Sequence, residues 1–99
     1  MQVLDDGSGW FDTEKAQKFS EDSVWNGSNH ISIATGSQWD HEELYRTKIR
    51  RWVLHFWSQW QGSLDRWEEI DHASAVTWMM KNDHGDHEAV QEAMAKREL

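Results

Sequence analysis

The chain has 99 residues, a length that accommodates one small domain with one compact core. It contains no cysteine, which excludes disulfides, thiolate nucleophiles and sulfur-ligated metal sites. No apolar run approaches the roughly 20 residues that a membrane-spanning helix needs. The first residues lack a basic stretch followed by an apolar one, so we expect no secretory signal and a cytoplasmic location.

The formal net charge of −8 is unevenly distributed. Residues 1–43 carry nine acids and two bases, and residues 58–99 carry nine acids and four bases. Between them, residues 44–57 form a basic island with four bases and no acid. The acidic background disfavours non-specific binding to duplex DNA, because it repels phosphate. The alternatives are an ordinary acidic cytoplasmic protein and one whose surface imitates nucleic acid or docks on a basic partner.

The first part of the chain predicts short elements. Residues 12–21 fit either a helix capped by Asp12 or an edge strand. The Asn-Gly pair at residues 26–27 favours a turn, because both residue types accept a positive φ. Residues 30–33 then alternate as a short strand.

The clearest element is a β-hairpin with runs over residues 44–48 and 51–57 around Ile49-Arg50. The second run alternates two largely apolar sets of side chains, Trp52, Leu54 and Phe56 on one face and Val53, His55 and Trp57 on the other. A strand that is apolar on both faces is central in its sheet and covered on each side. We expect a helix as one cover and a Trp-bearing loop or a partner molecule as the other.

A third strand is expected over residues 65–70. It carries Glu68 and Glu69, which point to opposite faces. Either acid could pair across the sheet with Arg46 or Arg51, and in that case the basic island is structural.

Two helices are expected after the strands. Asp71 is a suitable N-cap for a helix over residues 72–82. Gly85 can end that helix in a left-handed conformation, and Asp86 then caps a weaker helix over residues 88–97. The first helix has one apolar stripe, formed by Ala75, Val76, Met79 and Met80.

These elements predict an α+β fold, with a small antiparallel sheet of three or four strands and a central hairpin. One main C-terminal helix and a weaker second helix complete it. Residues 1–9 are expected to be a flexible lead-in, residues 10–83 a single domain, and residues 84–99 a C-terminal helical extension.

Residues 25–63 contain the strings WNGSNHIS, TGSQW followed by HE, LYRT, RWVLH and WSQWQGS. This text resembles a family of small uncharacterised bacterial proteins associated with chromosomes, plasmids and phages, and the likeness covers about residues 10–83. By analogy, the resemblance implies an inhibitor or modulator of a host system, of the antirestriction or anti-CRISPR kind. The chain departs from the pattern at Ile49-Arg50, where a glycine is expected. This departure predicts a wider loop or an exposed Ile49 in place of a tight two-residue turn.

The histidines provide little evidence for a metal site. His84 and His87 have a spacing that can hold a divalent ion on a helix, but Gly85 between them should break the helix. We expect no bound metal and no cofactor. His55, within an apolar run, is expected to be a buried, hydrogen-bonded core histidine. The folded sheet could bring His30, His41 and His55 together.

Motifs for catalysis are also lacking. The sequence has no Gly-x-Ser-x-Gly turn and no phosphate-binding loop. Adjacent acids such as Glu42 and Glu43 point to opposite faces of a strand, so they do not share a substrate. A chain of this length has little room to enclose a substrate. We therefore expect a protein that is not an enzyme.

The eight tryptophans are the strongest feature of the composition. Each buries roughly 150–250 Å² when it is packed, and a small domain without cysteine needs such area to fold. We expect five or six of them in the core, Trp52 and Trp78 first. Trp39, Trp57 and Trp60 stand beside polar turn residues, a composition typical of interface hot spots.

We predict that the functional surface is formed by the hairpin and the loop after it. The basic island is the one stretch of an acidic chain that attracts an acidic partner. The interpretation favoured is an accessory protein that binds another protein. The alternatives are a single-stranded nucleic-acid binder and a small metal-dependent hydrolase. The predicted binding residues are Arg46, Lys48, Arg50, Arg51, Trp57, Gln59 and Trp60.

Overall fold

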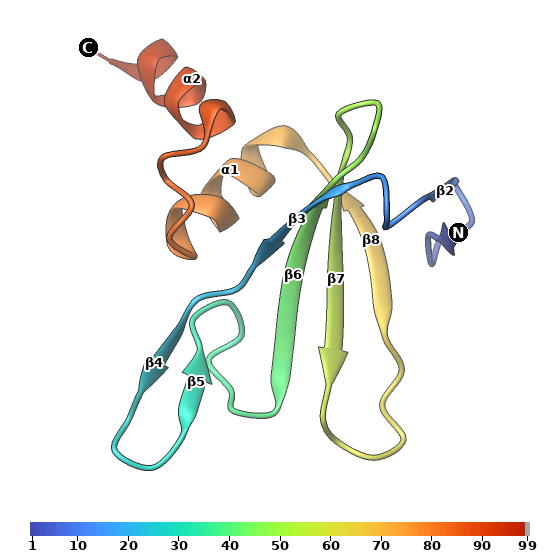
Figure 1. Cartoon of the computed structure of the whole chain (residues 1–99), viewed down its shortest axis with the longest axis vertical. Helices are drawn as coiled ribbons and strands as arrows, with labels where there is room; N and C mark the ends of the chain where they lie inside the picture. Colours follow the sequence, from blue (N-terminus) through green and yellow to red (C-terminus); the bar gives the residue numbers. More distant parts are fainter. Residues whose placement is uncertain (99) are drawn as a thin grey trace.

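The structure is a computed structural model that describes residues 1–98. At its centre lies an antiparallel sheet in the order β3-β6-β7-β8 (Figure 1), formed by β3 (Gln17–Ser20), β6 (Asp40–Arg46), β7 (Trp52–Ser58) and β8 (Arg66–Ile70). Two small sheets pair β1 (Gln2–Val3) with β2 (Trp10–Phe11) and β4 (Ser23–Trp25) with β5 (His30–Ser32). The helices α1 (His72–Lys81) and α2 (Glu88–Arg97) follow β8. The arrangement is α+β, as the sequence predicts.

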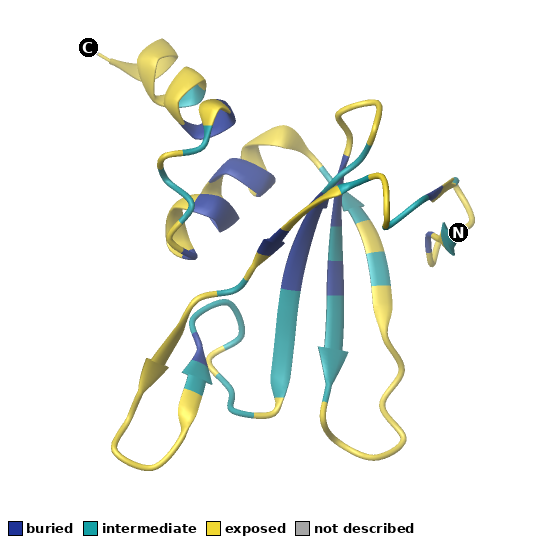
Figure 2. Cartoon of the chain, in the orientation of Figure 1, coloured by how far each residue is buried: buried dark blue, intermediate teal, exposed yellow. Residues whose placement is uncertain are grey.

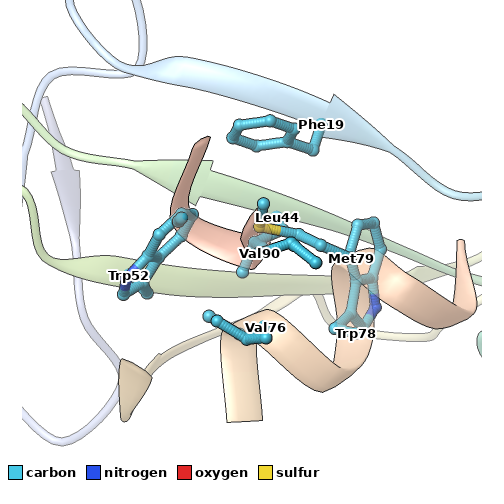
Figure 3. Close-up of a cluster of buried hydrophobic side chains, with 9 residues drawn as sticks. Phe19, Leu44, Trp52, Val76, Trp78, Met79 and Val90 are labelled. Atoms are coloured by element: carbon cyan, nitrogen blue, oxygen red, sulfur yellow. The ribbon is translucent and has the colours of Figure 1, made fainter. Parts of the chain in front are cut away.

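The strand β7 is central, as predicted, and a helix covers one of its faces. Leu44 of β6 and Trp52 of β7 point to this face, because side chains alternate along each strand. They belong to one buried cluster with Val76 and Met79 of α1 and Val90 of α2 (Figure 3). Because Ala89 and Val90 of α2 belong to this core, the described part of the predicted C-terminal extension packs on the domain.

The opposite face is covered by the N-terminal segment of the chain itself. β1 pairs with β2, and the amide of Asp5 donates to the carbonyl of Trp67 in β8 at 2.9 Å. Residues 1–9, expected to be a flexible lead-in, therefore form β1 and the loop of a hairpin that β2 completes, and this hairpin docks on the sheet. It provides the cover for which the sequence suggested a Trp-bearing loop or a partner. The second buried cluster consists of Leu4, Phe11, Tyr45 and Val53.

The ends of α1 match the prediction at one side only. The carboxylate of Asp71 caps the helix, accepting a backbone N–H of the first turn at 2.7 Å. The helix end was predicted wrongly, because Asp83, with φ of 65°, takes the left-handed position expected for Gly85. One residue later, the amide of His84 donates to the carbonyl of Met79 at 2.7 Å and closes the last turn.

The helices differ from the prediction at two further points. Met80, placed on the apolar stripe, is exposed. Trp78 is buried, as predicted, and its indole N–H donates to Glu42 of the sheet at 3.1 Å. The cap of α2 is His87 and not Asp86. The Nδ1 atom of His87 accepts the amide N–H two residues further on at 3.1 Å. Neither helix within residues 1–98 combines the length and the apolar character required to cross a bilayer.

Candidate functional site

The four bases of the basic island lie in or beside the turn between β6 and β7. This turn is a loop of three residues, in which the amide of Arg50 donates to the carbonyl of Thr47 at 2.9 Å and the amide of Thr47 to the carbonyl of Arg51 at 2.8 Å. Arg50 has a φ of 65°, in the position where loops of this kind favour glycine. The tip of the turn is exposed (Figure 2), and Ile49 is among its exposed residues. The wider loop and the exposed Ile49 expected without a glycine are both confirmed.

Two of the four bases are held by acids of the same chain. Arg51 pairs through Nε with Glu69 of β8, one of the cross-strand pairs that the sequence suggests. Arg46 donates to Glu88 of α2 at 3.2 Å, and its guanidinium lies over the Trp52 ring, 5.0 Å from the centroid. These two bases therefore have a structural role.

A cavity of about 410 Å³ opens between the N-terminal segment and this turn; we call it the hairpin pocket. Buried apolar side chains form part of its lining, namely Leu4, Phe11 and Val53. Two apolar side chains of its lining are largely exposed, Trp10 at 64% and Ile49 at 74%. Apolar groups that a monomer leaves in water beside a concave surface are typical of binding sites.

The charged groups of the hairpin pocket are mostly cationic. Three bases line it against two acids, Asp12 and Glu69. Glu69 is already paired with Arg51. Lys15 and Lys48 are exposed and form no ion pair within residues 1–98. The pocket therefore presents two available ammonium groups on a protein that is acidic overall.

Three predicted binding residues lie far from this pocket. Trp57 lies near the end of β7 that is distant from the β6–β7 turn (Figure 1). Gln59 and Trp60 follow that strand directly. At about 3.3 Å per strand residue, roughly 25 Å separates the turn from Gln59. The structure thus divides the predicted surface into two, with Lys48 and Arg50 at one end of the sheet and Trp60 at the other.

The distal end carries its own exposed aromatic pair. The Trp60 ring packs on Trp39 with centroids 5.0 Å apart, and the two residues are 59% and 40% exposed. Trp57, expected to be exposed, is half-buried and stacks with both His41 and His55. Of the three histidines that the sheet could bring together, His41 and His55 share Trp57 as a neighbour, whereas His30 packs on Trp25 of the β4–β5 hairpin.

His55 is the buried, hydrogen-bonded core histidine that the sequence predicts. Its Nδ1 lies 2.8 Å from Glu43 and its Nε2 lies 2.8 Å from Asp65. Because an ionised carboxylate only accepts hydrogen bonds, the Nδ1–H of His55 donates to Glu43. Burial alone would raise the pKa of Glu43, but hydrogen bonds from His55, Tyr45 and Lys18 together hold this pKa below its ordinary value. The network fixes β6, β7 and the loop before β8 to one another.

His84 and His87, considered above as a metal pair, serve the fold. Nε2 of His84 donates to the carbonyl of Ser20 at 2.7 Å, and Nδ1 of His87 caps α2. Both rings meet the ring of Phe19 edge-on. Within the part of the chain that the structure describes, no three His, Cys, Asp or Glu side chains gather as ligands for a metal ion.

Sequence reasoning missed the N-terminal half of the site. Trp10 and Lys15 were assigned no role, although Trp10 is exposed beside the buried Phe11. Alternation of exposed and buried residues is typical of a strand with one face on the core. A strand of two residues is too short for the sequence to show this alternation. The number of core tryptophans was also overestimated, because only Trp52 and Trp78 are buried, and the set of exposed ones comprises Trp10, Trp25, Trp39 and Trp60.

Comparisons of the chain with protein-family models, with curated proteins and with solved structures give no match. The family resemblance described above therefore stays an expectation. A functional argument for this protein rests on the geometry and charge of its surface.

Proposed function

We propose that the protein is a non-enzymatic binding module that contacts another protein through the hairpin pocket. One observation carries the proposal: a concave apolar lining, exposed apolar side chains and available cations occur together at one place. Apolar anchors in a pocket supply most of the affinity of a protein interface. Charged groups around such anchors select the partner and accelerate association.

The pocket is better suited to a protein than to single-stranded nucleic acid. Nucleic-acid binding of that kind needs several aromatic rings along a cationic groove. Here Trp10 is the tryptophan that lines the pocket, whereas Trp39 and Trp60 lie at the opposite end of the sheet. The cations and the aromatic pair therefore do not form one track for a strand.

A module of this kind works by occupying a surface of its partner. The proposed setting is the bacterial cytoplasm, where a cysteine-free chain needs no oxidising compartment. Inhibition of a host defence system, of the antirestriction or anti-CRISPR kind, is the biological role that this proposal favours. The support for that role is the sequence resemblance, and the support for binding is the pocket.

The test is capture of a partner by charge-reversed variants. Lys48→Glu/Arg50→Glu reverses two exposed bases at the turn, and Lys96→Glu/Arg97→Glu makes the same change of net charge on α2. Each protein is immobilised, and the proteins that it retains from a bacterial lysate are quantified by mass spectrometry. We expect the wild type and the α2 variant to retain the same partner and the turn variant to lose it, with a melting temperature within a few degrees of the wild type.

Two results would contradict the proposal. Retention of the same partner by the turn variant would place the binding site elsewhere. Release of the retained material by nuclease treatment would show that nucleic acid is the partner. Repeating the capture at increasing salt concentration tests the same alternative, because nucleic-acid binding weakens steeply as the salt concentration rises.

A further inference from the structure

We infer that the hairpin pocket recognises a short acidic segment that carries one large apolar side chain. In this arrangement the apolar side chain enters the pocket, and carboxylates on either side of it meet Lys15 and Lys48. The inference rests on the proposed function and adds the chemistry of the partner to it.

The size and lining of the pocket argue for one apolar anchor. Its volume of about 410 Å³ is at the lower end of the range for ligand sites, roughly 300–1,000 Å³. Leu4, Phe11 and Val53 form the buried apolar part of its lining. Trp10 and Ile49 stand beside this surface and are largely exposed, so an anchor seated there would also cover them.

The two walls of the pocket argue for carboxylates on both sides of the anchor. Lys15 belongs to the turn after β2, and Lys48 belongs to the turn between β6 and β7, so each wall contributes one ammonium group. The third cation, Arg51, is occupied by Glu69. Asp12 accepts the amide of Glu14 at 3.0 Å and keeps its charge, so three bases against two acids leave the pocket one positive charge in excess. The available charge in the pocket is therefore positive.

The net charge of −8 opposes the approach of an acidic segment, and its magnitude has to be weighed against the local attraction. At physiological ionic strength the Debye length is about 8 Å, so distant exposed acids are largely screened. Ammonium groups in direct contact with a ligand carboxylate are screened much less. Local attraction therefore dominates in physiological salt, and strong dilution of the salt brings the long-range repulsion back.

The experiment is a selection from a library of random nine-residue peptides displayed on phage. The full-length protein is the bait, and the enriched peptides are synthesised with a fluorescent label for measurement of binding by anisotropy. We expect the enriched peptides to share one Phe, Leu, Trp or Met with Asp or Glu on both sides. Each should bind at least ten-fold more weakly when its apolar residue is replaced by serine.

Two variants locate the binding site. Lys15→Glu/Lys48→Glu should lower the affinity for the enriched peptides at least ten-fold, whereas the matched control Lys96→Glu/Arg97→Glu should bind them as the wild type does. All four side chains are exposed, so we expect both variants to fold. Circular dichroism melts check this.

Three outcomes would overturn the inference: no enrichment, enrichment of peptides without flanking acids, and equal affinity of Lys15→Glu/Lys48→Glu for the enriched peptides. These outcomes are distinct from failure of the proposed function. If the turn variant still loses its partner from the lysate, the pocket is a binding site for a ligand of another class. If that variant keeps the partner, the binding module itself is placed wrongly.

Discussion

Glu43→Gln should lower the stability of this protein, whereas Glu42→Gln at the neighbouring position should leave it unchanged or raise it slightly. Glu43 points to the same face of the sheet as Tyr45 of β6 and His55 of β7, and both of these donate to its Oε1 atom at 2.8 Å. Glu42 points to the helical face, where the indole N–H of Trp78 donates to it at 3.1 Å. Hydrogen bonds outweigh burial and lower the pKa of Glu43, whereas burial raises the pKa of Glu42.

The size of the stability change expected for Glu43→Gln follows from the contacts of its carboxylate. Glu43→Gln removes the negative charge that faces His55 and Lys18, whose ammonium lies 3.3 Å from Oε2. Hydrogen bonds to charged groups contribute about 1.5–3 kcal/mol, and the amide oxygen keeps part of this. We expect a loss of about 2 kcal/mol, or roughly 8–16 °C in Tm for a domain of this size. Glu42→Gln keeps an acceptor for Trp78 and removes a partly buried charge, so we expect no loss or a small gain at pH 7.

The pH dependence of unfolding gives the sign of each glutamate's contribution to stability independently. The pKa of Glu43 is lower in the folded than in the unfolded chain, so its stabilisation is complete above its ordinary pKa of 4.5 and is lost as the pH falls through the folded pKa. The pKa of Glu42 is raised on folding, so its ionised form opposes folding as the pH rises above 4.5. Urea unfolding of the three proteins from about pH 3 to about pH 8 measures both effects. Equal losses for the two variants at pH 7, or an unchanged Glu43→Gln, would refute this reasoning.

Other changes test the core, the turn and the absence of a metal. Trp52→Ala removes a buried ring and should lower the stability by roughly 3–5 kcal/mol, whereas Trp60→Ala at an exposed site should leave Tm within a few degrees; similar melts for both would contradict the core assignment. Arg50→Gly should raise Tm by a few degrees, because a left-handed non-glycine residue costs roughly 1–2 kcal/mol, and Arg50→Ala, which keeps that strain, should not. Asp71→Ala should cost about 1 kcal/mol in chemical denaturation, since it removes a helix cap, and an unchanged midpoint would disprove the cap. Elemental analysis of untagged protein should find less than one Zn, Mn or Fe per chain, and one retained ion would favour the hydrolase alternative.

The parts of the fold that were predictable have local signals. The two-residue alternation in β7 marked it as a strand with two apolar faces, and both faces are covered. Asp71 was identifiable as a cap because a short acceptor precedes an apolar helical pattern. The turn at Ile49-Arg50 was also predictable, since the missing glycine excludes the tightest hairpin connection.

The parts that were missed depend on contacts between distant segments. β1 and β2 have two residues each, so no periodicity marks them, and they are held by packing on the sheet and by the contact of Asp5 with Trp67. The hairpin pocket forms only when this segment lies against the β6–β7 turn, and Lys15 therefore gave no signal. Trp60 was joined to the basic island because it is near in sequence, but a fully extended strand carries it to the other end of the sheet.

The central claim is that a protein partner binds at the hairpin pocket, and mapping of amide chemical shifts tests it most directly. The ¹⁵N-labelled protein is titrated with the partner purified by capture on the wild type, and the amide resonances are followed by nuclear magnetic resonance. The pocket predicts that the largest changes occur at Leu4, Trp10 and Ile49. Unchanged resonances there, with the changes gathered at Trp39 and Trp60, would contradict it.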